Sequence, residues 1–250
     1  MKITYLNHSG FMLEGDTCYC LFDYYKGNIP TLDSGKDIFV FCSHSHEDHF
    51  NPDIFQLKHQ YPKVTYVFSN EVRKTCKRRL RDETELFSQI LFLKSRDDYE
   101  IAGVGGTKLK IHTLLSTDRG CAFIIEYEGC VIYHAGDLNN WVWEEESEEW
   151  NHRMRQNFRK EMQYLEGKIL DIAFVPLDPR QGKDYCLGMK ELLEKTTVKH
   201  LFPMHFWNDF SVIEKYIREY ELPEQTHIYK IKYDGETWDI PWERGKKDEI

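Results

Sequence analysis

The alternation of apolar and polar residues predicts many short strands, with helices between and after them. Apolar runs bounded by glycine, aspartate or charged residues indicate strands, and two of these runs, DIFVFC and VTYVF, are continuous enough to be buried on both faces. The strands predicted in this way are residues 2–6, 11–13, 18–22, 37–42, 64–68, 108–115, 121–126 and 131–134. A hairpin turn is expected at 126–129.

Helices and further strands alternate in the remaining segments. Helical periodicity predicts helices at 52–59, 70–87, 149–165, 187–194 and 211–220, and further strands are expected at 169–176, 200–203 and 227–233. The basic residues at 73–81 are interpreted as a solvated helix face. Two groups of strands flanked by helices favour an α/β fold, a four-layered αββα sandwich. Residues 1–250 are expected to form one such domain.

Composition narrows the classes of partner. The chain has 250 residues, 41% of them hydrophobic, and a net charge of −9, so its surface repels the phosphates of nucleic acids and membranes. It shows neither the apolar run of about 7–15 residues of a signal peptide nor the ~20 of a membrane span. The odd number of cysteines, seven, then predicts reduced thiols in a cytoplasmic protein. A small-molecule substrate is expected, and a homo-oligomer is compatible with this composition.

The densest chemical signal follows the strand at 37–42. Residues 41–50 read FCSHSHEDHF and hold three histidines and two carboxylates within six positions. His44 and His46 project the same way because side chains alternate along extended backbone, whereas Asp48 and His49 can aim at a second point. Imidazole nitrogen and carboxylate oxygen suit zinc, iron or manganese. The segment therefore predicts a metal site.

These residues resemble those of a known family. HSHEDH matches the HxHxDH motif of the metallo-β-lactamase superfamily. Residues 133–140, YHAGDLNN, resemble the strand-end Gly-Asp that supplies the superfamily's bridging carboxylate, here Asp137. Residues 202–206, FPMHF, resemble its late strand-end histidine, here His205. The resemblance implies the αββα sandwich and up to two zinc ions, with manganese or iron as alternatives.

The opening segment, NHSGFMLE followed by LFDYY, is similar to one branch of the superfamily. That branch contains the L-ascorbate-6-phosphate lactonase-like proteins and small uncharacterised bacterial hydrolases. The resemblance implies that His8 lies at the pocket edge, where it would contact substrate; a capping role in a turn is the alternative. It also implies that Asp23 orients a metal-bound histidine.

The chain departs from the superfamily pattern at one ligand. A further histidine usually precedes a glycine that opens a strand, but here the segment reads IHTLLSTDRGCAF. Alignment on Gly120 places Thr117 at the histidine position, next to Asp118. Three alternatives remain open: Asp118 replaces the histidine, His112 reaches in from the preceding strand, or the first metal site is incomplete.

Two further groups of residues are candidates for a pocket. Asp178 and Arg180 follow the predicted strand 169–176, and Arg180 could bind an anionic group through its planar fork or form a surface salt bridge. Asn139, Asn140 and Trp141 follow Asp137 and could line the pocket. The alternating Trp and Glu residues at 141–150 favour an amphipathic helix that packs on the sandwich.

The ligand assignment that follows from the resemblance implies a mechanism. His44 and His46, with Asp118 or His112, would hold one metal; Asp48, His49 and His205 would hold the second, with Asp137 as the bridge. A metal-bound hydroxide would attack a small, anionic ester, lactone or phosphoester, and the catalytic carboxylates Asp48 or Asp137 would carry the proton. The alternatives are a non-enzymatic metal-binding or sensor protein and a di-iron redox protein. A nuclease is disfavoured because neither a further domain nor a basic face is visible.

Overall fold

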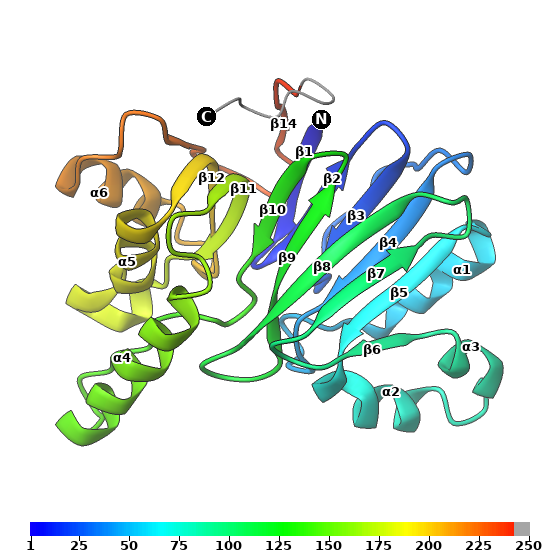
Figure 1. The fold of residues 1–250 in the computed structure, drawn as a ribbon, viewed down its shortest axis with the longest axis horizontal. Coiled ribbons are helices and arrows are strands. Elements are labelled where there is room, and N and C mark those ends of the chain that lie inside the picture. The colour runs from blue at the N-terminus through cyan, green and yellow to red at the C-terminus, as the bar shows by residue number, and fades with distance from the viewer. Residues whose placement is uncertain (243–250) are drawn as a thin grey trace.

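The computed structural model describes residues 1–242 and contains two seven-stranded sheets packed face to face (Figure 1). In spatial order, the first sheet consists of β14 (Thr237–Asp239), β1 (Lys2–Asn7), β2 (Gly10–Glu14), β3 (Cys18–Phe22), β4 (Asp37–Cys42), β5 (Val64–Ser69) and β6 (Leu91–Leu93). The second consists of β13 (His227–Ile228), β12 (Thr197–Met204), β11 (Ile169–Pro176), β10 (Cys130–His134), β9 (Cys121–Tyr127), β8 (Lys108–Leu115) and β7 (Asp98–Ala102).

Each sheet has an antiparallel part and a parallel part. In the first sheet β1, β2 and β3 are antiparallel neighbours and β3 to β6 are parallel. In the second sheet β7 to β10 are antiparallel and β10 to β13 are parallel. Loops at the carboxyl ends of parallel strands are the usual place for ligand sites in such sheets.

Helices cover part of each outer face of the sandwich. They are α1 (Leu57–Gln60), α2 (Arg73–Arg79), α3 (Thr84–Ser88), α4 (Glu148–Met162), α5 (Leu187–Lys195) and α6 (Ser211–Glu219), with 3-10 turns η1 (Pro52–Gln56), η2 (Asn70–Val72) and η3 (Pro179–Asp184). In Figure 1, α1–α3 lie beside the first sheet and α4–α6 beside β11 and β12. This arrangement confirms the αββα sandwich predicted from the sequence.

The core lies between the sheets and is strongly aromatic. Every residue of β4 is buried, as its continuous apolar run predicted. The ring of Phe41 lies 5.3 Å from that of Phe123 on β9, and Phe11 on β2 lies 4.4 Å from Phe174 on β11. Each such pair adds about 0.5–1.5 kcal/mol to the free energy of area burial. These contacts join the two sheets and hold their loop ends in register.

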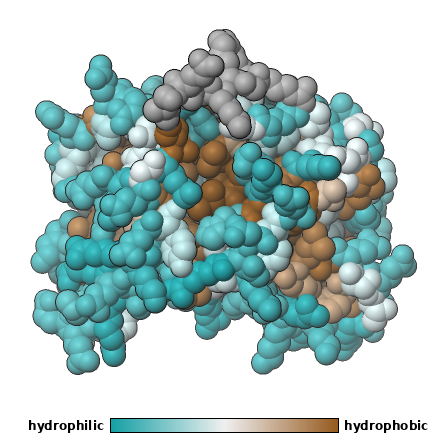
Figure 2. Space-filling view, in the orientation of Figure 1, coloured by the Kyte–Doolittle hydropathy of each residue, from teal (hydrophilic) through white to brown (hydrophobic). Residues whose placement is uncertain are grey.

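The outer face of β7–β9 carries no helix in the view of Figure 1, and its strands alternate accordingly. Burial along β8 follows the pattern eBeBiBBe, with Lys108 and Lys110 exposed. Figure 2 shows hydrophobic residues gathered over the strands in the middle of this face, with hydrophilic side chains around them. No helix within residues 1–242 is long and apolar enough to cross a membrane.

The seven cysteines are all buried and free. Cys18 and Cys20 lie in the same hydrophobic cluster, in one packed layer, as their alternation along a strand predicted.

Two predicted elements differ from the structure, and three of its strands were not predicted. The helix expected at 70–87 is divided into η2, α2 and α3, because α2 ends where the Leu80 amide bonds to the Cys76 carbonyl. The strand expected at 227–233 is only β13, which pairs with two residues of β12. Strands β6, β7 and β14 were not predicted, since they are edge or near-edge strands with few buried residues.

Two glycines press against the loop that follows β4. Gly120 has φ +70° and Gly136 has φ +51°, a region that favours glycine. A Cβ on Gly120 would lie 1.8 Å from the Ser43 carbonyl oxygen, and one on Gly136 would lie 2.6 Å from the Ser43 Cβ. The Cys121 amide also donates to the Ser43 carbonyl at 3.2 Å. Ser43 is therefore fixed between loops of the second sheet.

We expect Gly120→Ala to destabilise the protein by more than ~3 kcal/mol, because a backbone clash adds to the cost of positive φ. Gly129→Ala is the matched control: its φ is +84°, but nothing lies within 4 Å of the added Cβ, so only about 1–2 kcal/mol is expected. Denaturant unfolding of both variants measures the difference. Equal losses would show that the contact with Ser43 is not the constraint.

Candidate metal centre

The loops that follow strands of both sheets converge at one edge of the sandwich. His44, His46, Asp48 and His49 occupy the loop after β4, where the amides of His49 and Phe50 both donate to the His46 carbonyl and close a tight turn. The remaining acidic and histidine side chains come from other loops: His8 from the β1–β2 turn, Asp118 from the β8–β9 loop, Asp137 after β10 and His205 after β12.

These side chains form two groups of potential metal donors. In each group one ligand atom per residue lies within 4.8 Å of every other. The first group is His44, His46, Asp118 and Asp137; the second is His8, Asp48, His49 and His205. The sequence predicted His44 and His46 on one side and Asp48, His49 and His205 on the other; the structure places Asp118 and Asp137 with the first group and His8 with the second.

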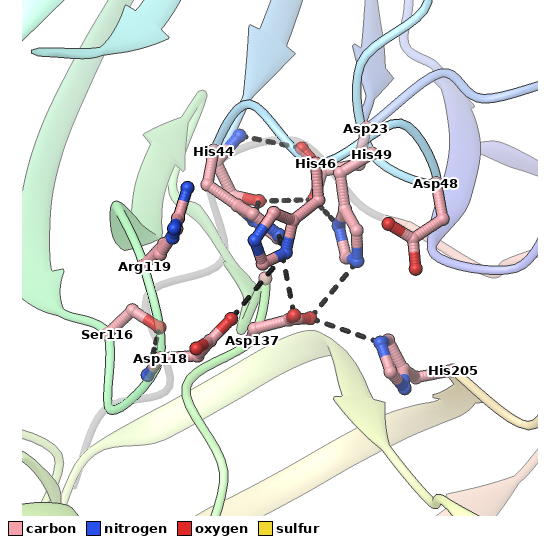
Figure 3. Close-up of polar contacts among 12 residues, drawn as sticks. Asp23, His44, His46, Asp48, His49, Ser116, Asp118, Arg119, Asp137 and His205 are labelled. Carbon is pink, nitrogen blue, oxygen red and sulfur yellow. Dashed lines mark hydrogen bonds and ion pairs between the residues drawn. The ribbon is translucent and has the colours of Figure 1, made fainter. Parts of the chain in front are cut away.

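Asp137 lies between the two groups (Figure 3). Its Oδ2 is 3.4 Å from His44 Nε2, and its Oδ1 is 3.1 Å from His49 Nε2 and 3.4 Å from His205 Nε2. The carboxylate is almost fully buried. It therefore occupies the position at which a carboxylate could bridge two cations.

The buried carboxylate of Asp23 fixes two of the histidines, His44 and His49. Asp23 accepts hydrogen bonds from the Ser43 amide, the Ser43 hydroxyl and His49 Nδ1. Since the Ser43 hydroxyl donates to Asp23, its oxygen accepts from His44 Nδ1 at 3.0 Å. Both imidazoles thus carry a proton on Nδ1 and turn Nε2 toward Asp137. Asp23 has the orienting position that the resemblance implied.

A second buried carboxylate holds His205. Asp178 Oδ2 accepts from His205 Nδ1 at 2.9 Å, which directs His205 Nε2 toward Asp137. Asp178 also accepts from the amide, Nε and Nη2 of Arg180. Burial would raise the pKa of Asp178, but the hydrogen bonds from His205 and Arg180 outweigh it and lower the pKa to about 2. Asp178 therefore remains ionised and keeps His205 in place.

The protonation of the cluster follows from burial and charge. Burial lowers the pKa of His44 to about 3 and that of His8 to about 4, so both rings are neutral. Burial would raise the pKa of Asp137, yet His49, His205 and His44 hold it well below its usual range. Asp137 and Asp23 raise the pKa of His49 well above its usual value against the effect of burial.

Three buried polar atoms support a metal at this place. His8 Nε2, His49 Nε2 and Asp137 Oδ1 have no hydrogen-bond partner within residues 1–242. Such atoms are costly unless a ligand satisfies them. All donors are nitrogen or oxygen, which fits zinc, manganese or iron and excludes a thiolate site. The described residues therefore fit two divalent cations.

His8 occupies a different place from the one expected. It was predicted at the pocket edge, but it is 3% exposed and does not line the cavity above the cluster. Its Nε2 lies 3.3 Å from Asp48 Oδ2, and its ring lies 4.2 Å from that of His205. His8, Asp23 and His205 have positive φ values of 55°, 39° and 64°, and such backbone strain is typical of functional sites.

The two candidates for the missing superfamily ligand lie apart. Asp118 Oδ2 is 3.6 Å from His46 Nδ1, within the first group. His112 Nδ1 bonds to Asp98 at 2.8 Å on the outer face of β7–β8, and His112 lines a separate cavity. Thr117, at the superfamily's histidine position, joins the Asp118 loop to the Asp137 loop through hydrogen bonds with Asn139.

A cavity of about 390 Å³ opens above the cluster. Its floor consists of His46, Asp48, Asp118, Asp137 and His205, and its walls consist of Thr117, Trp141, Trp143, Trp150, Met154, Arg180 and Trp207. Trp141 and Trp143 were expected on an amphipathic helix, but the structure places them in a non-helical segment before α4. Asn139, Asn140 and Trp141 are all buried. Arg180 forms the salt bridge with Asp178 and also lines the cavity.

Sequence reasoning missed several residues of this site. Ser43 gave no signal, since its role depends on the approach of Asp23, which lies 20 positions earlier in the chain. Trp150 and Met154 lie at i and i+4 on α4 and resemble ordinary core residues in the sequence. Only the packing of α4 over the strand ends brings them to the cavity.

Known proteins share this fold. A metal-dependent hydrolase of the UPF0173 group from Heliobacterium modesticaldum is 24% identical over 230 residues, 86% of each chain. Among solved structures, a metallo hydrolase from the archaeon Ignicoccus hospitalis has a TM-score of 0.56 at 18% identity and covers 96% of this chain and 99% of its own. A diiron β-hydroxylase from Streptomyces venezuelae has a TM-score of 0.62 at 11% identity, over 96% of this chain and 54% of its own.

The match to a family agrees with the motifs and with the sandwich. The family described as the beta-lactamase superfamily domain matches residues 2–153, more than half of the chain, a range that contains the HSHEDH loop and Asp137. The resemblance expected from the sequence is therefore confirmed, and the chain belongs to the beta-lactamase superfamily.

Proposed function

We propose that this protein is a metal-dependent hydrolase of a small ester, lactone or phosphoester. The observation that carries the proposal is the pair of four-residue donor groups that meet at Asp137 on the floor of a cavity. A purely structural metal would have a closed donor shell, whereas here His46 and Asp118 have side chains 39% and 43% exposed. The first site is thus open to water and substrate.

We assign the metal ligands from the two donor groups. His44, His46 and Asp118 would hold one cation, His8, Asp48, His49 and His205 the other, and Asp137 both. Zinc suits this set of imidazoles and carboxylates, and manganese or iron suit it as alternatives. The fold shared with a diiron β-hydroxylase concerns the architecture alone, so we favour hydrolysis over redox chemistry on the strength of the hydrolase relatives.

The protein's own groups would orient and deprotonate the reactants. Two bound cations would supply a water of lowered pKa and polarise the carbonyl or phosphoryl oxygen. Asp48 lines the cavity with its side chain 22% exposed, so it can accept a proton and pass it to solvent. Asp137 is directed at three histidines and serves chiefly to hold the two halves of the site together, with proton transfer as its second role.

The substrate is proposed to carry an anionic group. Bound cations are the strongest positive charges in such a site and attract anions even to a chain of net charge −9. Arg180 bonds to Asp178 through Nε and Nη2, so within the described residues its Nη1 is available to a second oxygen at the cavity wall. The anionic group would therefore lie beside Arg180 and the reacting bond above Asp137.

We expect the purified wild-type protein to contain up to two divalent cations per chain, and both His46→Ala and Asp137→Ala to lose one or both. Elemental analysis of protein purified without added metal measures this. Asp118→Ala should lower the occupancy of one site, whereas His112→Ala should not, because His112 lies on the outer face of β8. Wild-type metal content in both His46→Ala and Asp137→Ala would contradict the site, and the reverse ranking of Asp118 and His112 would contradict the first ligand set.

We expect Asp178→Ala to weaken metal binding about 10–100-fold, because His205 loses the acceptor that orients it. Asp98→Ala is the matched control: Asp98 makes the same contact with His112 Nδ1, at 2.8 Å against 2.9 Å, but outside the cluster. Competition with a chelator gives the affinity of each variant. Similar effects of the two substitutions would show that Asp178 acts through general stability.

We expect turnover in a panel of lactones, esters and phosphodiesters assayed with zinc and with manganese, with the highest kcat/KM for an anionic member. Arg180→Ala should raise KM for that substrate about tenfold, in keeping with a lost charge-assisted hydrogen bond. Turnover confined to neutral esters, or a wild-type KM in Arg180→Ala, would contradict the proposal that the substrate carries an anionic group beside Arg180. Absence of turnover by the metal-loaded protein across the panel would count against these classes of substrate.

A further inference from the structure

Four of the chain's six tryptophans line the cavity above the metal centre. Trp141 and Trp143 are parallel, with centroids 5.9 Å apart and an interplanar angle of 0°. Trp150 and Met154 face the same space from α4, and Trp207 lies beside His205. Flat apolar side chains thus form much of the cavity wall, which favours a ligand with an apolar part.

Trp141 and Trp143, together called the tryptophan wall, are held rigid although their segment lacks regular secondary structure. Trp141 Nε1 donates to the Asp137 carbonyl at 2.9 Å. The amide and carbonyl of Trp143 both bond to the buried Asn151 side chain, at 3.0 and 2.8 Å. Gln181 Nε2 donates to the carbonyls of Asn140 and Val142. The segment that carries these rings is therefore ordered before any ligand enters, which lowers the entropic cost of binding.

One indole remains incompletely covered. Trp207 is 45% exposed although its ring lies 4.6 Å from that of His8, and its backbone has a positive φ of 52°. The Arg180 guanidinium lies 4.5 Å from the centroid of Trp207 and 5.8 Å from that of Trp143. Asp178 fixes that guanidinium, so Arg180 completes a wall of flat groups rather than a mobile arm.

We propose that this cavity binds a planar aromatic ring, so that the substrate is an aryl-bearing acid derivative whose ring stacks on Trp143 and Trp207. Aromatic rings gain from offset or edge contacts with indoles, which a saturated ring of the same size does not make. A cationic ring is disfavoured, because it would meet Arg180 and the bound metals. A volume of about 390 Å³ lies near the lower end for ligand pockets and accommodates one or two rings.

The reaction of such a substrate rests on the proposed function, but the binding of the ring does not. The test therefore measures binding to the metal-loaded full chain by calorimetry, with phenylacetate and cyclohexylacetate as probes. The two acids have the same charge and the same linker, and they differ in that one ring is planar and the other puckered. We expect phenylacetate to bind the wild-type protein about threefold to tenfold more tightly.

Variants of the two indoles at the cavity assign this preference. Trp143→Ala and Trp207→Ala should each reduce the affinity for phenylacetate about threefold or more and bring the ratio of the two affinities close to one, whereas Trp143→Phe and Trp207→Phe should retain it. Tyr233→Ala is the control for loss of an exposed aromatic residue, because Tyr233 is 60% exposed and does not line the cavity. Arg180→Gln should weaken both acids equally.

Equal binding of the two acids by the wild-type protein, no binding of either, or a preference that survives in both alanine variants would overturn the inference. Since Trp207 is 45% exposed, we expect Trp207→Ala to fold even if Trp143→Ala does not. An aryl preference in a protein that hydrolyses nothing would refute the proposed function and leave the inference standing. Hydrolysis with no aryl preference would refute the inference and leave the proposed function standing.

Discussion

The buried carboxylate of Asp23 is the interaction on which the metal centre depends. It accepts three hydrogen bonds, two from Ser43 and one from His49, and through the Ser43 hydroxyl it also sets the tautomer of His44. A buried charge is tolerated only when it is fully paired, and burial would otherwise raise the pKa of Asp23. The hydrogen bond from His49 and the nearby imidazoles lower that pKa instead, so the carboxylate stays ionised. The orientation of two candidate ligands therefore rests on a residue that touches neither substrate nor metal.

The position of this carboxylate depends in turn on the packing of the two sheets. Ser43 is fixed between Gly120 and Gly136 of the second sheet, each with a conformation that only glycine adopts readily. His134, buried beneath them, accepts from the Gly136 amide and lies 4.0 Å from Asp23. A displacement of one sheet relative to the other would therefore move the loop after β4 and the loop after β10 apart. The aromatic contacts of the core prevent such a displacement.

The metal centre and the cavity above it come from different parts of the chain and meet different physical requirements. The centre concentrates charge and needs polar partners in a buried place, and Asp23 and Asp178 supply them from below. The cavity walls are apolar and flat, and they come from the segment after Asp137, from α4 and from the loop after β12. Arg180 connects the two regions, because it pairs with Asp178 and stacks on Trp207. Substitutions in the cavity walls would thus alter the substrate preference with little effect on the metal ligands.

The sequence by itself determined the fold class and the strand ends at which the chemistry lies. Continuous apolar runs such as β4 indicate buried strands locally, and the dense HSHEDH segment needs no knowledge of the rest of the chain. Edge strands such as β7 were not predictable, because their residues are half exposed and depend on a neighbour for pairing. Asp118 and His112 are almost equally close to the HSHEDH loop in the sequence. Only the tertiary structure separated them, because strand alternation turns His112 to the outer face of β8 while the loop after β8 brings Asp118 to His46. The same holds for His8, Ser43 and the tryptophan wall. The position of each depends on contacts between residues far apart in the chain, and local sequence patterns do not predict such contacts.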